Sequence, residues 1–218
     1  MKNNPKPRNK KEVNALDDIG EVAAILFNKK GYLETTMNEI SAAAKLSKGG
    51  IHHYFPKKHD ILFFILNKYM GLILSGMEKE LEETTDSLSK IRLLISYHIN
   101  YFVKNMSEGK ILFHEVYLLP AKYHKIIFKK EKKYRQVVSD VLSDFLGNDV
   151  TKDELTALTF SLLGMCNWIY SWYNPDKALT SSDLVNIVSR LFCTGVCGYE
   201  RSKRKAKRNP IKVSSLKN

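Results

Sequence analysis

The chain has 218 residues, a formal net charge of +12 and 44% hydrophobic residues, so it can bury a sizeable core and favours a polyanionic partner. Residues 1–70 carry a net charge of +5, residues 71–197 are neutral, and residues 198–218 carry +7. The sequence has no stretch of about 18 uncharged apolar residues, which argues against a membrane span. Its polar N-terminus lacks the apolar run of a signal peptide. We therefore expect a cytoplasmic protein with no membrane partner.

The cysteine pattern and the motif content argue against catalysis. The three cysteines, Cys166, Cys193 and Cys197, lie in apolar helical patterns, so we expect buried, reduced thiols. His52 and His53 would point about 100° apart on a helix and have no cysteine or carboxylate partner in the pattern, so we expect no metal site. HExxH, CxxC and Gly-rich phosphate-loop motifs are absent from the sequence. We therefore expect neither an enzyme nor a cofactor.

The N-terminal part of the chain predicts a basic arm followed by a helix. Residues 1–12 contain Pro5, Pro7 and five Lys or Arg residues, a composition typical of a disordered segment. Apolar residues from Leu16 to Phe27 then recur at helical spacing, and Gly31 follows as a stop signal.

Two short helices and the start of a long one come next. Thr36 and Glu39 have the spacing of a capping box, which opens the first short helix. Ser47 is the N-cap candidate of the second, and Pro56 ends it. From Lys57 onward a long apolar pattern predicts an extended helix.

The remainder of the chain is helical in pattern as well. Apolar periodicity and cap or stop signals predict helices over residues 91–102, 109–118, 126–145 and 155–173, and from about residue 182. Sustained alternation and Asn-Gly or Asp-Gly turns, which would indicate strands, are absent from the sequence. The prediction is an all-α protein with about nine helices and no repeats.

Two short helices joined by a tight turn are typical of a helix-turn-helix, whose second helix enters the DNA major groove. The N-terminal residues of that helix must be short or polar to let the backbone approach the bases. Ser47 can cap the helix or bond a phosphate, and Lys48 supplies positive charge. Gly49 and Gly50 add no bulk, although each interior Gly costs roughly 1 kcal/mol of helix stability. We infer that this helix is built for close approach.

Four further residues extend this candidate surface. His52 and His53 are expected on the exposed side of the second helix, where their rings can bond bases or phosphates. Lys57 and Lys58 stand at the start of the next helix, where backbone N–H groups already favour an anion. A phosphate between the two lysines would explain their position, and a plain solvated charge pair is the alternative.

The stretch TTMNEISAAAKLSKGGIHHYFPKKHDIL, with the preceding VAAILFNKKGY, resembles the DNA-binding head of the TetR/AcrR family of transcriptional regulators over residues 13–66. The resemblance implies a homodimer that binds a pseudo-palindromic operator and is released by a ligand in its C-terminal bundle. Carried over by position, it implies DNA contacts by Thr36, Lys48, Gly50, His52, His53 and Lys58, with capping alone as the alternative role of Thr36. Together with the residues above, the predicted DNA-binding set is Thr36, Ser47, Lys48, Gly49, Gly50, His52, His53, Lys57 and Lys58.

The body of the protein would need an apolar cavity for such a ligand. Aromatic residues in its helical patterns pack in a core more often than they line a pocket, and lone histidines are more often satisfied core or boundary residues. If the body does hold a ligand, the aromatic and histidine residues that would line its pocket are His98, Tyr101, Phe102, Phe113, His114, Tyr117 and Trp168.

Residues 162–196 predict an antiparallel helix pair around an Asn-Pro-Asp turn, and two such pairs would form a four-helix dimer interface. The predicted interface residues are Leu162, Met165, Ile169, Trp172, Leu184, Ile187, Val188 and Leu191. With its NW..WY.P pattern, the segment also resembles a TetR subgroup that includes repressors responding to acyl-CoA thioesters. Lysines at positions 122, 125, 129 and 130 can supply charge for the CoA phosphates, and a solvated helix face is the alternative.

These predictions combine into one domain plan: a disordered basic arm at 1–12, a helix-turn-helix DNA-binding domain at 13–60, a ligand-binding and dimerisation domain at 61–198, and a basic tail at 199–218. The fold is an N-terminal three-helix head followed by a C-terminal helical bundle that dimerises. The predicted function is a dimeric repressor, released from a pseudo-palindromic operator on double-stranded DNA by a small apolar effector such as an acyl-CoA thioester. A sequence-nonspecific architectural DNA-binding protein is the alternative.

Overall fold

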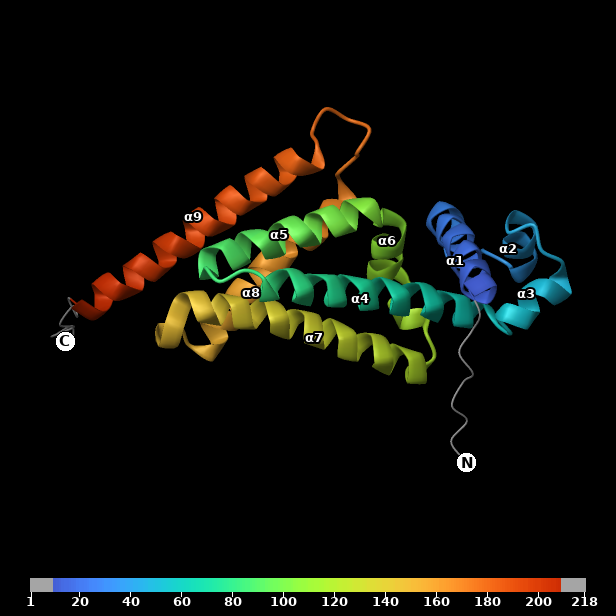
Figure 1. Cartoon of the computed structure of the whole chain (residues 1–218), viewed down its shortest axis with the longest axis horizontal. Helices are drawn as coiled ribbons and strands as arrows, with labels where there is room; N and C mark the ends of the chain where they lie inside the picture. Colours follow the sequence, from blue (N-terminus) through green and yellow to red (C-terminus); the bar gives the residue numbers. More distant parts are fainter. Residues whose placement is uncertain (1–9, 209–218) are drawn as a thin grey trace, which may run out of the picture. The chain divides into compact units, whose positions relative to one another are not determined.

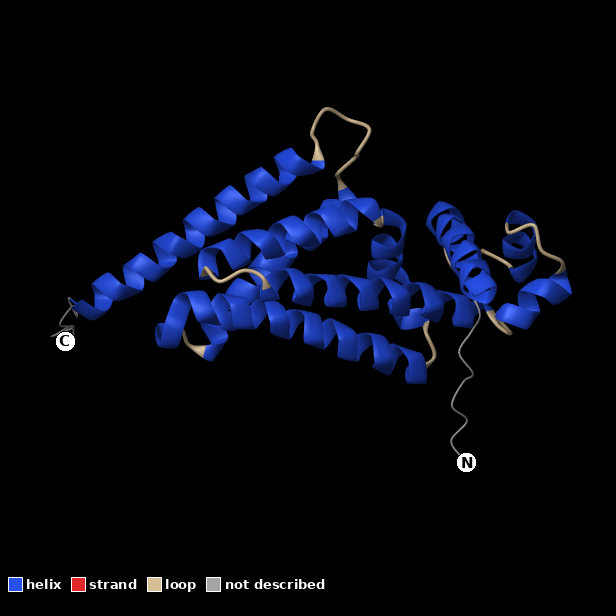
Figure 2. Ribbon diagram, viewed as in Figure 1, coloured by secondary structure: helices blue, strands red, loops and turns tan. Residues whose placement is uncertain are grey.

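The computed structural model describes residues 10–208, and every regular element in that range is a helix (Figures 1 and 2). The nine α-helices confirm the all-α prediction for this part of the chain. Three short 3-10 helices accompany them: η1 (Val116–Leu118), η2 (Gly147–Asp149) and η3 (Trp168–Ser171). The α-helices are α1 (Lys10–Lys30), α2 (Met37–Ala43), α3 (Lys48–Tyr54), α4 (Lys58–Glu82), α5 (Ser87–Lys104), α6 (Met106–Glu115), α7 (Ala121–Leu146), α8 (Lys152–Asn167) and α9 (Ser181–Arg208).

Side-chain caps fix where several of these helices begin. The hydroxyl of Thr151 accepts from the backbone N–H of Glu154, whose carboxylate accepts from the backbone N–H of Thr151, and this capping box opens α8. The hydroxyl of Thr180 accepts in the same way from the backbone N–H of Asp183 at the start of α9. Each such cap satisfies backbone donors that have no partner inside the helix.

The structure divides into two compact units. The described part of the first unit comprises residues 10–74 and 105–132, and that of the second comprises residues 75–104 and 133–208. The predicted DNA-binding domain at 13–60 falls within the first unit, whereas the predicted ligand-binding domain at 61–198 is shared between the two. The domain boundaries themselves stay a prediction.

Apolar side chains at helical spacing form the core of the first unit. Phe27 of α1, Ile40 of α2, Ile51 of α3 and Ile61 of α4 are almost completely buried. The short helices α2 and α3, seven residues each, are too short to be stable alone and depend on this packing. The core therefore holds α3 in place and leaves its other face in solvent.

The second unit is built around α5, which lies against α9 and α8. Ile91, Leu94 and Ile95 of α5 are almost completely buried. Among the polar core groups is His98, whose Nδ1 lies 2.5 Å from the hydroxyl of Tyr134. Burial lowers the pKa of His98 to about 4, so the ring is neutral at physiological pH.

The helix boundaries differ from the predicted ones at both ends and in the C-terminal half. Residues 10–12 of the predicted disordered arm form the first turn of α1, while residues 1–9 lie outside the described part of the chain. The helix predicted over 155–173 ends at Asn167 and gives way to η3. The helix predicted from about residue 182 begins at Ser181 and continues through the first ten residues of the predicted tail, and residues 209–218 are outside the described range.

In the described range, one helix, α4, has the length and composition that could cross a membrane. Half of its apolar window is buried inside the protein, as in a core helix.

Candidate DNA-binding surface and ligand site

The start of α3 is an exposed, closely capped helix end. The Ser47 hydroxyl accepts from the backbone N–H of Gly50 at 3.0 Å, which confirms Ser47 as the N-cap. A Cβ on Gly50 would lie 3.2 Å from the Ser47 oxygen, closer than most side-chain contacts, so glycine suits this cap. A Cβ on Gly49 would meet nothing within 4 Å, and Lys48 is exposed beside it. The backbone here is accessible to a large partner.

The two histidines of α3 are both exposed, as predicted. The Nδ1 atom of His52 lies 3.2 Å from the carbonyl oxygen of Pro56. In the neutral ring, Nδ1–H donates to that carbonyl, which leaves Nε2 free to accept a hydrogen bond from outside. His53 contacts the ring of Tyr54 edge-on and keeps its own ring in solvent.

Lys57 and Lys58, predicted as a matched pair, have different environments. Lys57 is exposed, whereas the ammonium of Lys58 donates to the carbonyl oxygens of Tyr32 at 2.7 Å, Leu33 at 3.0 Å and Thr35 at 2.7 Å. It also lies 4.4 Å from the centre of the Tyr32 ring. All three N–H donors of the ammonium are therefore used within the protein.

The desolvation that accompanies this position lowers the pKa of Lys58. The sequence pattern could not show that the ammonium fastens the α1–α2 turn to the start of α4. A phosphate contact by Lys58 stays a prediction, and it would require the ammonium to leave at least one carbonyl.

The hydroxyl of Thr36 is engaged in the same way. It accepts from the backbone N–H of Glu39 at 3.2 Å and donates to the Glu39 carboxylate at 2.8 Å. The backbone N–H of Thr36 also donates to this carboxylate, which completes the predicted capping box of α2. Lys30 also bonds this carboxylate. The bond from Lys30, followed by those from Thr36, lowers the pKa of Glu39 to about 2. Capping is the role that the structure displays for Thr36, although the residue is exposed.

The predicted ligand-pocket residues are divided between the two units. Phe113, His114 and Tyr117 belong to the first unit, and Tyr117 is 65% exposed. The other four belong to the second unit, where His98 and Phe102 are core residues and Trp168 is 63% exposed. Their role as a ligand set stays a prediction.

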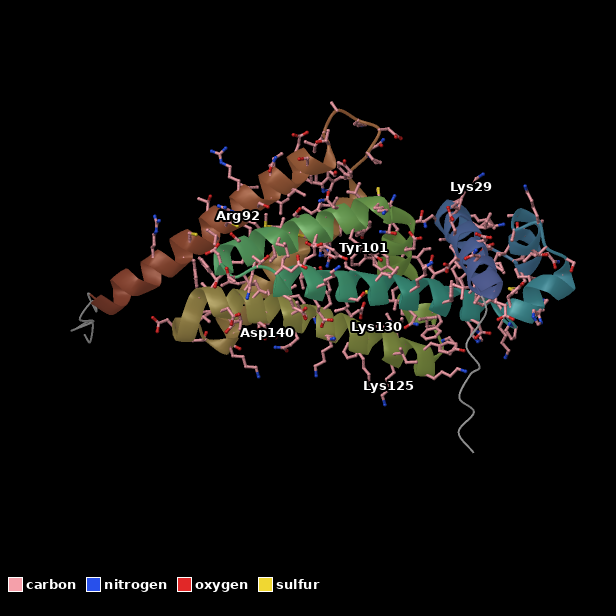
Figure 3. The ribbon with its side chains drawn as sticks, viewed as in Figure 1. Lys29, Arg92, Tyr101, Lys125, Lys130 and Asp140 are labelled. Carbon is pink, nitrogen blue, oxygen red and sulfur yellow. The ribbon has the colours of Figure 1, made fainter. Side chains whose placement is uncertain are left out.

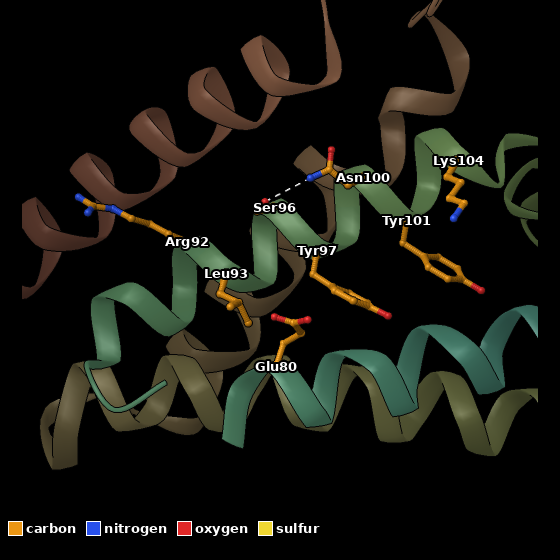
Figure 4. A pocket seen from close by; sticks show the side chains of 8 residues that line it. All are labelled: Glu80, Arg92, Leu93, Ser96, Tyr97, Asn100, Tyr101 and Lys104. Atoms are coloured by element: carbon orange, nitrogen blue, oxygen red, sulfur yellow. Dashed lines mark hydrogen bonds between the residues drawn. The ribbon is translucent and has the colours of Figure 1, made fainter. Parts of the chain in front are cut away.

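A hollow of about 530 Å³ does exist in the second unit, on the side of α5 that faces the end of α4 (Figure 4). Tyr101, a predicted residue, lines it together with Tyr97, Leu93 and Glu80. The rings of Tyr97 and Tyr101 are nearly parallel, 6.0 Å apart. A Cβ on Gly76 would lie 1.8 Å from the Tyr97 hydroxyl, so the absent side chain makes room for the phenol.

The Tyr97 phenol stays protonated in this position. Burial, and then the negative charge of Glu80, raises its pKa. The hollow thus presents two aromatic rings and the neutral hydroxyl of Tyr97, a combination suited to a ligand with apolar and hydrogen-bonding parts.

The predicted dimer-interface residues fall into two groups. Leu162, Ile169, Leu184 and Val188 are buried within the protein, so they are core residues here and not a free interface. Met165 is half-buried. Only three of the predicted residues are well exposed: Trp172, Ile187 and Leu191.

Two large apolar residues join that exposed group. Phe160 was missed by sequence reasoning, and Trp168 was assigned to the ligand pocket, yet they are 57% and 63% exposed. We define the exposed apolar face of the second unit as Phe160, Trp168, Trp172, Ile187 and Leu191. Gly164, Gly195 and Gly198 would each carry a Cβ that meets nothing within 4 Å. Large exposed apolar side chains and helix backbone without side chains both suit close helix–helix association.

The four lysines that the sequence suggested as ligands of the CoA phosphates also differ in their environments. Lys130 donates to the carbonyl oxygen of Asn67 at 2.7 Å, so its ammonium is already engaged. Lys125 and Lys129 are exposed on α7, where Figure 3 labels Lys125. Lys122 is exposed and lies over the ring of Tyr123.

The all-helical architecture and the exposed, capped α3 define a helix-turn-helix protein of the regulatory class. Residues 19–63 match the family described as bacterial regulatory proteins, tetR family, and residues 84–196 match the tetracyclin repressor-like C-terminal domain. The second match covers more than half of the chain, and the chain therefore belongs to the TetR family of DNA-binding transcriptional regulators. This confirms the family resemblance and the prediction of a regulator that is not an enzyme.

Related proteins share this organisation at low identity. The transcriptional activator FasR of Mycolicibacterium smegmatis is 22% identical over 164 residues, which cover 75% of this chain and 74% of FasR. The transcriptional repressor KstR2 of Mycobacterium tuberculosis is 20% identical over 170 residues, covering 77% and 85% of the two chains. A crystal structure of AibR in complex with isovaleryl coenzyme A and operator DNA superposes with a TM-score of 0.72 and 29% identity, covering 82% of this chain and 98% of AibR.

Proposed function

We propose that this regulator is a homodimeric repressor that binds a pseudo-palindromic operator through α3 and is released from it by an acyl-CoA thioester. The observation that carries the DNA-binding part is the exposed start of α3, where Ser47 caps the helix and Lys48 and Gly49 stand open to solvent. The backbone at this end of the helix can approach the base edges closely, because no bulky side chain at Gly49 or Gly50 would lie between them.

Base reading and phosphate binding would be divided along α3 and the start of α4. Gly49, Gly50, His52 and His53 present backbone and imidazole groups to the bases. Lys48 and Lys57 are exposed cations suited to phosphates. Thr36 and Lys58 would act mainly by holding α2 and the α1–α2 turn in place, because their polar groups are engaged within the protein.

Dimerisation would use the exposed apolar face of the second unit. Two copies of this face, related by a two-fold axis, would bring α8 and α9 of each subunit into one four-helix contact. Such a contact would remove five large apolar side chains from solvent in each subunit. A two-fold dimer in turn presents two α3 helices to a pseudo-palindromic site.

The effector assignment is supported by two observations. The AibR structure, 29% identical to this chain, contains isovaleryl coenzyme A together with operator DNA. The hollow lined by Leu93, Tyr97 and Tyr101 offers an apolar and aromatic surface of a size that can take a short acyl group. Binding there would favour a conformation of the dimer whose heads no longer match two adjacent major grooves. We place this activity in the cytoplasm.

Footprinting on the DNA upstream of the gene tests the proposal, with and without a set of acyl-CoA thioesters. A symmetric protected site that is lost when a thioester is added is the expected result. Lys48→Ala should weaken binding to specific and nonspecific DNA alike and reduce the salt slope by about 1, because one phosphate contact is removed. Lys177→Ala, which removes an exposed lysine from the loop before α9, is the matched control.

Three outcomes would contradict parts of the proposal. Equal affinity for all sequences would favour an architectural DNA-binding protein and refute operator recognition. Protection that persists with every thioester would refute the effector class. Increased transcription from the protected promoter in the presence of the protein would refute the repressor role.

A further inference from the structure

A second groove, of about 770 Å³, runs between α5 and α9 in the second unit. Arg92 of α5 and Arg190 and Arg201 of α9 line it. Hydroxyl and amide groups from Ser96, Ser189 and Asn186 line it as well. The groove therefore combines three permanent positive charges with neutral hydrogen-bonding groups.

The arginines are concentrated here beyond what composition predicts. The chain has seven arginines among its 35 basic residues, and the side chains of Arg92, Arg135, Arg190 and Arg201 are those described in the structure. Three of these four line the groove. Arginine, with its rigid planar fork of donors, suits two-point binding of phosphate oxygens better than lysine does.

The described lining of the groove offers no compensating negative charge. The described residues that line it include no aspartate or glutamate. The buried Cys193 thiol does not supply an anion either, because burial raises its pKa and outweighs the opposing effect of Arg92. Each of the three guanidinium groups can donate charge-assisted hydrogen bonds to an anionic ligand in the groove.

The groove adjoins the hollow on the other side of α5, because Arg92 and Ser96 contribute to the lining of both. Figure 4 shows the Tyr97 and Tyr101 rings on the α4 side of α5 and the Arg92 side chain extending away from them. The two sides of α5 thus offer an aromatic surface and a cationic surface that meet at one residue pair. A ligand that carries both an apolar group and several phosphates matches this arrangement.

We infer that Arg92, Arg190 and Arg201 form a binding site for the phosphates of a ligand with at least two phosphate groups, such as the 3′-phospho-ADP part of coenzyme A. The choice of coenzyme A over another organic phosphate rests on the proposed function. The arginine groove itself does not depend on that choice.

Direct binding measurements without DNA test this inference. Isothermal titration of the full-length protein with coenzyme A, adenosine 3′,5′-bisphosphate, dephospho-CoA, ADP and pantetheine separates the phosphate contribution from the rest. We expect coenzyme A and the bisphosphate to bind, dephospho-CoA to bind about tenfold more weakly, and pantetheine to bind weakest, since each lost charge-assisted contact weakens affinity by about that factor. ADP binding as tightly as coenzyme A would keep the phosphate site and identify a free nucleotide as its ligand.

Arginine variants locate the site. Arg190→Gln and Arg92→Gln should each weaken coenzyme A binding about tenfold and leave pantetheine binding unchanged. Arg135→Gln, which changes the fourth described arginine, outside the groove, should bind coenzyme A as the parent does. If all three variants weaken coenzyme A binding equally, the effect is one of general charge and the proposed site is overturned. If Arg190→Gln and Arg92→Gln both bind coenzyme A with the affinity of the parent, the site is overturned as well. Sedimentation of each variant shows whether the dimer is kept, and a loss of affinity found only in a variant that dissociates would overturn the site as well.

Failure of this inference is distinguishable from failure of the proposed function. If a thioester releases the operator from Arg190→Gln and Arg92→Gln at the parent concentration, the effector class stands and the arginine site is wrong. If coenzyme A binds in an arginine-dependent manner but the operator stays protected, the site stands and the effector role is wrong.

Discussion

Replacing Lys58 with methionine should destabilise the first unit while leaving the exposed DNA-binding residues in place. Methionine keeps the apolar stem but removes the ammonium that donates to the carbonyl oxygens of Tyr32, Leu33 and Thr35. The variant therefore separates the turn-fastening role of Lys58 from its predicted phosphate contact.

The magnitude follows from the three hydrogen bonds. A hydrogen bond to a charged group contributes about 1.5–3 kcal/mol when fully buried, but the Leu33 end of this cluster is exposed and water can replace the ammonium there. We expect a combined loss of about 2 kcal/mol, which for a 218-residue chain that unfolds as one unit lowers the melting temperature by about 4–8 °C.

Thermal and urea unfolding of Lys58→Met provide the assay, and Lys57→Met is the matched control because Lys57 is exposed at the neighbouring position. Lys57→Met should unfold at the same temperature and urea concentration as the parent protein, and it should bind DNA more weakly at low salt. Lys58→Met should lose stability, and its affinity at low temperature, where the head is folded, should change less than that of Lys57→Met. A fully stable Lys58→Met protein with a salt slope reduced by about 1 would refute this reasoning and restore Lys58 as a phosphate ligand.

Three further predictions concern other parts of the molecule. Burial lowers the pKa of His98 from 6.5 to about 4, so between these pH values the unfolded state binds more protons than the folded state. The free energy of unfolding should therefore fall by about 3 kcal/mol as the pH drops from 6.5 to 4. A free energy of unfolding that stays constant in that window would contradict this prediction. Leu191→Arg should dissociate the dimer in sedimentation equilibrium without lowering subunit helicity, and an unchanged dimer would exclude this face as the interface. Glu39 has its pKa lowered from 4.5 to about 2 by Lys30 and Thr36, so its contribution to stability is complete above 4.5 and lost as the pH falls toward 2. Glu39→Gln should remove that part of the acid dependence, and an identical acid profile would show that the capping box contributes nothing measurable.

The DNA-binding head was largely predictable because its signals are local. The Thr36–Glu39 capping box and the Ser47 cap involve residues three apart, and the structure contains both. The role of Lys58 was not predictable, since its carbonyl partners lie 23 to 26 residues earlier in the chain. Local spacing identifies a cation at a helix start, but only the packed structure shows what that cation meets.

The C-terminal helices show a second limit of sequence periodicity. Leu162 and Phe160 are both apolar residues of α8, yet the first is 2% and the second 57% exposed. A hydrophobic pattern identifies side chains that avoid water, and it does not distinguish burial within one chain from burial against another copy. This is why residues that are buried within the chain, such as Ile169, were predicted at the interface.

The hollow and the arginine groove could not be predicted from the sequence because they depend on small and charged residues without a periodic signal. The arginine groove joins residues about 100 positions apart, Arg92 and Arg190, which no local motif connects. Gly76 is informative only beside Tyr97, whose hydroxyl occupies the space that a side chain would fill. The sequence contained these residues but gave no reason to group them.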